Sequence, residues 1–178
     1  MTNNVFIITG TQGSGKTTFL NKIIEELGKR DLKMGGFLAA GSWKNHKRDK
    51  FELQDIKSGR RIIYCQSEPV EGWEKAIHFY INPDGQRFGD WSLNPENLKN
   101  VDLVVIDEVG PFELEGRGWA GSITRIFAET NLPMIWTVRE SALFDIIKKW
   151  NPDSVKILHI EKTDVQGAVG IILETIGM

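Results

Sequence analysis

Apolar and polar positions follow one another along this chain in an order that predicts alternating strands and helices. Nearly continuous apolar runs, typical of strands covered on both faces, lie at residues 5–8, 34–41, 101–106 and 133–138, and a final strand is predicted at 154–160. Apolar residues recur at helical spacing over residues 19–27, 119–127, 142–147 and 165–176. This order predicts an α/β fold with a mostly parallel sheet, helices on both faces, and ligands at the carboxyl ends of the strands.

The pattern changes between residues 42 and 100. Residues 42–50 are polar and basic, and we interpret them as a solvated loop tip rather than a nucleic-acid patch. Alternating positions at 51–56 and 61–65 flank a glycine-containing turn and predict a β-hairpin. Residues 67–100 are irregular apart from a predicted strand at 76–82, and a segment of this length suggests an insertion or lid. Its aromatic residues Trp73, Phe88 and Trp91 offer base stacking, but we favour anchoring to the core.

The first apolar strand runs into the sequence Gly-x-x-x-x-Gly-Lys-Thr, from Gly10 to Thr17. Glycine at positions 10 and 15 permits turns closed to other residues, so that backbone N–H groups can face phosphate oxygens. The helix that follows turns its free N–H groups toward the same anion. Lys16 would reach the β- and γ-phosphates, and the Thr17 hydroxyl would bind Mg²⁺. This is the Walker A or P-loop pattern; the alternative is a glycine-rich turn that only connects a strand to a helix. The predicted nucleotide-binding residues are Gly10, Thr11, Gln12, Gly13, Ser14, Gly15, Lys16, Thr17 and Thr18.

A second motif, four apolar residues followed by Asp107 and Glu108, has the Walker B form. Together with a P-loop it predicts that Asp107 holds Mg²⁺ in concert with Thr17. Glu108 lies one residue further on, so it faces the other side of the strand end and is the candidate general base for the attacking water. The alternative for Glu108 is an ion pair with an arginine that braces the loop.

Phosphoryl transfer calls for a cation besides Lys16 and the metal. Arg139 follows a predicted strand and is the first candidate, with a catalytic role. Arg117 is the second, although a surface ion pair is the more ordinary role for it. Thr137, near the end of the same strand as Arg139, is a candidate for contacting the γ-phosphate or the attacking water.

Length, charge and cysteine content change this picture little. The chain has 178 residues, 22 basic and 24 acidic side chains and a formal charge of −2, which predicts one domain over residues 1–178 and does not favour a nucleic-acid partner. One cysteine, no signal peptide and no apolar run of membrane-spanning length predict a cytoplasmic protein without a membrane partner. Residues 161–164, Glu-Lys-Thr-Asp, resemble the guanine-reading Asn-Lys-x-Asp motif but lack its asparagine, and we interpret Thr163 as a helix cap. Three scattered histidines do not favour a zinc site.

The P-loop, the Asp107–Glu108 strand end and its continuation Val-Gly-Pro-Phe-Glu-Leu at residues 109–114 together resemble the THEP-type nucleoside triphosphatases. The resemblance extends to Gly36-Phe37 and to Phe-Glu-Leu at residues 51–53. It implies a RecA-like P-loop NTPase fold that hydrolyses the β–γ bond of ATP, GTP and other nucleoside triphosphates with Mg²⁺ and with loose base selectivity. One departure is Ala39-Ala40, where many relatives carry acidic residues.

Two other functions fit the same motifs. One is a small-molecule or nucleoside kinase in which residues 67–100 bind an acceptor and Glu108 deprotonates its hydroxyl. The other is a nucleotide-gated binding module that turns over slowly and signals through residues 110–121. Phosphate release without an acceptor, acceptor-dependent ADP formation, and tight binding with negligible turnover distinguish the three.

Overall fold

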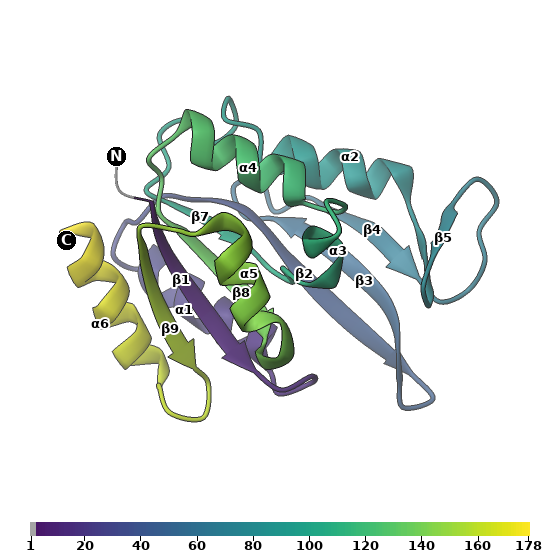
Figure 1. Ribbon diagram of the computed structural model, residues 1–178, viewed down its shortest axis with the longest axis horizontal. Helices are drawn as coiled ribbons and strands as arrows, with labels where there is room; N and C mark the ends of the chain where they lie inside the picture. Colours follow the sequence, from purple (N-terminus) through teal and green to yellow (C-terminus); the bar gives the residue numbers. More distant parts are fainter. Residues whose placement is uncertain (1–2) are drawn as a thin grey trace.

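The computed structural model describes residues 3–178, in which nine strands form one sheet in the order β5-β6-β4-β3-β2-β7-β8-β1-β9 (Figure 1). The strands are β1 (Asn4–Gly10), β2 (Met34–Lys44), β3 (Lys47–Asp55), β4 (Arg61–Gln66), β5 (Glu74–Ala76), β6 (Phe79–Ile81), β7 (Leu103–Ile106), β8 (Met134–Arg139) and β9 (Ser154–His159). The helices are α1 (Lys16–Gly28), α2 (Pro83–Ser92), α3 (Pro111–Leu114), α4 (Ala120–Glu129), α5 (Leu143–Trp150) and α6 (Val165–Ile176), with a 3₁₀ turn η1 (Glu140–Ala142). None of these helices is long and apolar enough to cross a membrane.

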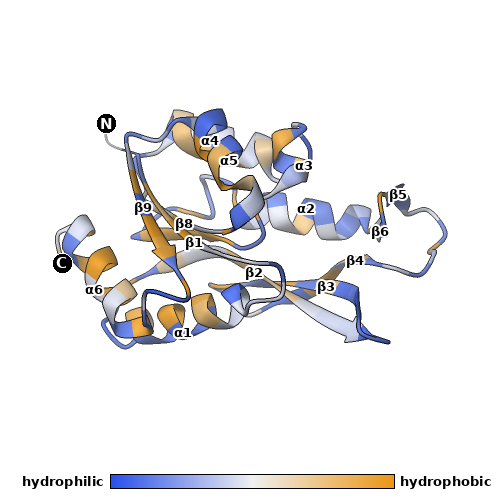
Figure 2. Cartoon of the chain, turned by 60° about the horizontal axis from the view of Figure 1, so that its bottom comes forward, coloured by the Kyte–Doolittle hydropathy of each residue, from blue (hydrophilic) through white to orange (hydrophobic). Residues whose placement is uncertain are grey.

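Strands β2, β7, β8, β1 and β9 are parallel and form the part of the sheet that carries helices on both faces. Alternate side chains of β1 enter different cores. Phe6 and Ile8 pack with α1 and α6, whereas Val5 and Ile7 pack with α4 and α5. Figure 2 shows these two helical layers on opposite sides of the sheet. The predicted three-layer α/β fold is confirmed.

The sheet continues beyond β2 as antiparallel strands, and here residues 42–50 are mostly exposed, as predicted, but the predicted loop is wrong. β2 runs on to Lys44 and β3 begins at Lys47, so the polar stretch is the end of a long hairpin rather than a loop. Trp43 pairs with Arg48 across the hairpin, and the Arg48 guanidinium lies 4.3 Å from the Trp43 ring centroid. Such cross-strand pairs stabilise a hairpin whose sequence has no apolar run, so hydrophobic patterning does not predict its strands. The predicted pairing of β3 with β4 is confirmed.

Residues 67–100 contain two short strands, where the sequence pattern predicted one, and a helix that the pattern did not predict. The single strand expected at residues 76–82 is a hairpin, in which β5 and β6 pair antiparallel. Helix α2 begins after Asn82, whose side chain accepts from the N–H of Asp84, and Pro83 occupies its first turn. Its buried residues are Gly85, Gly89 and Ser92, so the helix has no stripe of large apolar side chains.

Of the aromatic residues of α2, Phe88 agrees with the anchoring interpretation, whereas Trp91 is 41% exposed. Phe88 packs against the core, and its ring centroid lies 5.7 Å from that of Trp91. The guanidinium of Arg60, beside the β3–β4 turn, lies 5.7 Å from each of the two rings. These contacts hold α2 against that turn.

Candidate nucleotide-binding site

The P-loop connects the end of β1 to the start of α1 through two residues in the left-handed conformation. Gly13 has φ +73° and Gly15, the N-cap of α1, has φ +91°. Gly10 is required for a different reason than the sequence suggested, because a Cβ there would lie 2.8 Å from Ser14 Oγ and 3.0 Å from Ile160 Cγ1. The Ser14 hydroxyl donates to the Thr11 carbonyl oxygen at 2.7 Å. The loop is therefore shaped by close packing at its start and by backbone conformation at its end.

Lys16 lies inside this loop, 6% exposed. Its Nζ donates to the carbonyl oxygens of Thr11 at 2.8 Å and Gly10 at 3.5 Å. Burial lowers the pKa of Lys16, the negative charges of Glu108 and Asp107 raise it, and the positive charges of Arg139 and Arg48 lower it. The lysine is thus surrounded by two carboxylates and two guanidinium groups.

Asp107 is fully buried at the end of β7, where two neighbouring strands hold its carboxylate. Oδ1 accepts from the Thr137 hydroxyl at 2.5 Å, and Oδ2 accepts from the N–H of Ala39 at 3.0 Å. Burial raises the pKa of Asp107, as does the charge of Glu108, while hydrogen bonds from Thr137, Ala39 and the Thr17 side chain lower it. Thr17 and Asp107 therefore lie within reach of each other, and the Mg²⁺ site that the Walker motifs predict between them stays a prediction.

Glu108 continues the chain in the left-handed region, with φ +62°. Its N–H donates to Thr137 Oγ1 at 2.8 Å, and its side chain lines the space above the P-loop. The turn separates the directions of the two adjacent carboxylates, since one is buried and the other faces the open site. Thr137 is itself 1% exposed and is engaged with Asp107 and Glu108, so it positions the acidic pair rather than contacting a phosphate.

The three arginines near the motifs have different surroundings. Arg139 ends β8 and lines the same cavity as Lys16 and Glu108. Arg117 lies in a separate depression, where it pairs with Glu74 at 3.3 Å and its guanidinium lies 5.1 Å from the Phe112 ring. Arg48, which sequence reasoning missed as a site residue, lines the cavity of the P-loop. The one sequence feature that could have indicated a role for Arg48 is Trp43, an aromatic residue in an otherwise polar stretch.

Two cavities meet at this site. The first, of about 310 Å³, lies over the P-loop; its walls are Gln12, Gly13, Gly15, Lys16, Thr17, Thr18, Ala40, Gly41, Trp43, Arg48, Phe51, Glu108 and Arg139. We call it the phosphate cavity. The second, of about 280 Å³, lies between β3, β4, the β5–β6 hairpin and α3, and we call it the side cavity. Gln12, Phe51, Glu108 and Arg139 line both.

The donor set suits Mg²⁺. Thr17 and Asp107 supply a hydroxyl and a carboxylate, the hard oxygen ligands that this ion takes together with phosphate oxygens and water. Within residues 3–178, no three His, Cys, Asp or Glu side chains gather into a metal cluster. A buried carboxylate whose pKa is raised by burial also gains from a nearby cation.

The guanine-reading resemblance at residues 161–164 has a structural explanation, with one correction. The cap of α6 is Asp164, whose Oδ1 accepts from the N–H of Gly167 at 2.7 Å, rather than Thr163. Asp164 is therefore engaged in capping the helix.

The layered sheet, the loop around Lys16 and the strand end at Asp107 define an α/β P-loop nucleotide-binding protein. A family model described as NTPase matches residues 5–173, and the chain belongs to that family. Membership confirms the nucleoside-triphosphatase enzyme class and the THEP-type resemblance.

Two curated relatives and two solved structures illustrate the similarity. The nucleoside-triphosphatase THEP1 of Archaeoglobus fulgidus is 30% identical over 133 residues, covering 70% of this chain and 72% of the relative. That of Methanosarcina acetivorans is 24% identical over 167 residues, covering 87% and 86%. The crystal structure of THEP1 from Aquifex aeolicus matches with a TM-score of 0.71 and 20% identity, over 98% of this chain and 99% of that one. The solution structure of a human cancer-related nucleoside triphosphatase matches with a TM-score of 0.68 and 20% identity, over 98% and 97%.

Proposed function

We propose that this chain hydrolyses the β–γ phosphate bond of nucleoside triphosphates with Mg²⁺ and with loose base selectivity. The observation that carries the proposal is the acidic pair at the end of β7. The Thr137 hydroxyl donates to the buried Asp107 carboxylate and accepts from the N–H of Glu108. Both carboxylates lie near enough to Lys16 to raise its pKa. Two carboxylates with different surroundings can bind a cation and accept a proton at the same time.

Each residue then has a defined task. The N–H groups of the P-loop and the Lys16 ammonium bind the phosphates, and Thr17 with Asp107 would hold Mg²⁺, which neutralises charge on the β- and γ-oxygens when bound. Glu108 orients a water molecule and accepts its proton as the oxygen attacks the γ-phosphorus. Arg139 faces the same space from the end of β8 and stabilises the charge on the transferred group.

Loose base selectivity is supported by what surrounds the phosphate cavity. The β2–β3 hairpin places two aromatic residues, Trp43 and Phe51, on this cavity, and Trp43 is 53% exposed. A flat, exposed ring stacks on any base, because every base has a π-face. Asp164, the residue that resembles a guanine reader, caps α6 instead.

The test is steady-state phosphate release from ATP, GTP, CTP and UTP, with Mg²⁺ or with EDTA, for wild type and Glu108→Gln. We expect release from all four nucleotides only with Mg²⁺, and a fall of roughly two orders of magnitude or more in Glu108→Gln with nucleotide binding retained. Glu129→Gln, at an exposed position on α4, is the matched control and should release phosphate at the wild-type rate. Unchanged turnover in Glu108→Gln would remove the general base from the proposal. Tight binding with negligible wild-type turnover would instead favour the nucleotide-gated module.

A further inference from the structure

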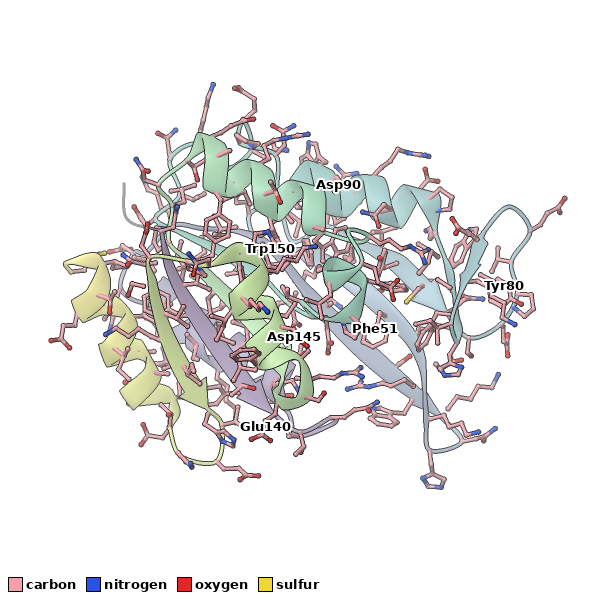
Figure 3. All side chains as sticks on the ribbon, in the orientation of Figure 1. Phe51, Tyr80, Asp90, Glu140, Asp145 and Trp150 are labelled. Carbon is pink, nitrogen blue, oxygen red and sulfur yellow. The ribbon has the colours of Figure 1, made fainter. Side chains whose placement is uncertain are left out.

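The side cavity has no role in hydrolysis as described above. Water needs no apolar chamber, yet five aromatic residues, from β3, β4, β6, α3 and the start of α4, line this one: Phe51, Tyr64, Phe79, Phe112 and Trp119. The Phe51 and Phe79 ring centroids lie 5.6 Å apart, and those of Tyr64 and Trp119 lie 4.9 Å apart. Figure 3 shows Phe51 on β3, between the parallel half of the sheet and the β5–β6 side. Apolar walls that remain in contact with water are unfavourable, and a ligand that covers them gains free energy.

The side cavity adjoins the phosphate cavity at the residues that the proposed function places beside the γ-phosphate. Thr17 and Thr18, on the first turn of α1, line the phosphate cavity and not the side cavity, whereas Glu108 and Arg139 line both. In the proposed function, Glu108 and Arg139 are the groups beside the transferred phosphoryl group. A molecule in the side cavity would therefore present its near end to Glu108.

The lining also defines what kind of molecule fits. Arg139 is the only Lys or Arg among the described residues that line the cavity, and it also lines the phosphate cavity. This argues against an acceptor that itself carries phosphates, since such groups call for several cations. Deeper in, Glu113 already accepts from the N–H groups of Gly110 and Trp119, so the interior offers mainly apolar surface. At about 280 Å³ the space is near the lower end of ligand pockets, roughly 300–1,000 Å³, so the occupant is small.

We propose that the side cavity binds a small alcohol with an aromatic or apolar body as a phosphoryl acceptor, so that the chain also acts as a kinase. The proposal rests on the position of the γ-phosphate in the proposed function. Glu108 accepts the hydroxyl proton, the alcohol oxygen forms a bond to the γ-phosphorus, and the bond from that phosphorus to the β–γ bridging oxygen breaks. The electron pair of the broken bond leaves with the nucleoside diphosphate. The products are a phosphate monoester, the diphosphate and a proton that Glu108 releases to water.

The β5–β6 hairpin supplies one wall of this cavity through Ala76, Ile77, His78 and Phe79. Ile77, in the turn between the two strands, has φ +56° and is 65% exposed. A β-branched residue in this conformation is strained. The segment that the sequence marked as an insertion or lid thus borders the proposed acceptor position.

The test uses wild-type protein with MgATP and three probes: benzyl alcohol, 4-methylphenol and, as the hydrophilic control, glycerol. ADP and inorganic phosphate are measured in the same reaction, and ³¹P NMR detects a phosphate monoester. We expect an ester signal and more ADP than phosphate with an aromatic probe, but not with glycerol. Equal ADP and phosphate with every probe overturns the acceptor proposal and leaves hydrolysis standing. No ADP under any condition overturns both.

Cavity-filling variants separate acceptor binding from catalysis. Cys65 is buried and lines the side cavity, so Cys65→Met reduces its volume while Cys65→Ala, the matched control, keeps it open. We expect transfer to the aromatic probe to fall by at least roughly 10- to 200-fold in Cys65→Met, because methionine is larger by two carbon atoms and one methylene in an apolar pocket already has an effect of this size. Phosphate release without alcohol should stay within about twofold of wild type in both variants.

A second pair of variants guards against a folding defect in Cys65→Met. Ala76→Leu fills the cavity from the hairpin, and Ala128→Leu adds the same side chain at an exposed position on α4. Transfer that survives in both folded filling variants overturns the assignment of this cavity. If transfer and hydrolysis fall by the same factor in these variants, the assignment of the side cavity as the acceptor site is also overturned.

Discussion

The Thr137 hydroxyl donates to Oδ1 of Asp107 at 2.5 Å while accepting from the N–H of Glu108 at 2.8 Å. A single buried side chain on β8 therefore fixes both the proposed metal-binding carboxylate and the left-handed turn that carries the proposed base. The two strands are neighbours in the sheet, with Ile106 in register with Trp136. In the proposed function, catalysis depends on that register as well as on the motif residues.

Thr137→Val removes the hydroxyl while keeping the shape of the side chain. The variant leaves the Glu108 N–H and one Asp107 oxygen without a partner, which costs about 1–3 kcal/mol of stability. We expect kcat to fall with KM nearly unchanged, because Thr137 positions other groups and does not touch nucleotide. Thr137→Ser, which restores the hydroxyl, should recover most of the activity. Loss of stability without any change in kcat would make the role purely structural.

Arg139 and Arg117 provide a matched comparison of two arginines. Arg139 lines the phosphate cavity with Lys16, whereas Arg117 pairs with Glu74 at the surface. We expect Arg139→Ala to lower kcat by roughly 10²-fold or more, the scale of a lost transition-state donor. Arg117→Ala should remain within about twofold, as is usual for an exposed ion pair. Equal effects of the two substitutions on kcat would rule out Arg139 as the additional cation that stabilises the transition state.

Glu113 predicts how stability depends on pH. Burial raises the pKa of Glu113 from its ordinary 4.5 to about 7, although hydrogen bonds from the Trp119 and Gly110 N–H groups oppose the shift. The folded protein therefore holds this proton more tightly than the unfolded chain does, so stability falls as pH rises from about 4.5 to 7.

Thermal unfolding of wild type and Glu113→Gln between these pH values tests this sign. The variant cannot titrate at this position, and its other groups are those of wild type. We expect the Tm of wild type to decline relative to that of Glu113→Gln as the pH rises. Parallel curves would mean that the two N–H donors hold the pKa of Glu113 near its ordinary value.

The parts of the site that could be predicted are those whose functional residues lie next to one another in the sequence. Lys16 and Thr17 follow glycines at fixed spacing, and Asp107 with Glu108 ends an apolar strand, so sequence alone brought them to one edge of a sheet. Arg48 could not be found this way, because it reaches the P-loop only through the pairing of β2 with β3. The positioning role of Thr137 depends in the same way on β7 lying beside β8.

Helix α2 was missed for a different physical reason. Hydrophobic periodicity reveals a helix that buries large side chains, but α2 approaches its neighbours through glycine. A Cβ at Gly89 would lie 2.3 Å from the Trp119 ring, so the ring itself fills the space where a helix side chain would be. The apolar partner of the helix thus belongs to another segment of the sequence.

Asp107→Asn separates metal binding from folding. The carboxylate is fully buried and burial raises its pKa, so removing its charge relieves a desolvation cost in the free protein. An asparagine can accept from the Ala39 N–H with its oxygen and donate to Thr137 Oγ1 with its amide, but the Thr137 O–H then loses its acceptor and the second amide hydrogen has none. Because the relieved desolvation and the lost hydrogen bonds oppose each other, we expect the stability of the variant without ligands to lie within about 1–3 kcal/mol of wild type. Thermal unfolding with a non-hydrolysable ATP analogue, with and without Mg²⁺, should show a Mg²⁺-dependent rise in Tm for wild type and none for the variant. A Mg²⁺-dependent rise that persists in Asp107→Asn would mean that the ion is held by Thr17 and the phosphates alone.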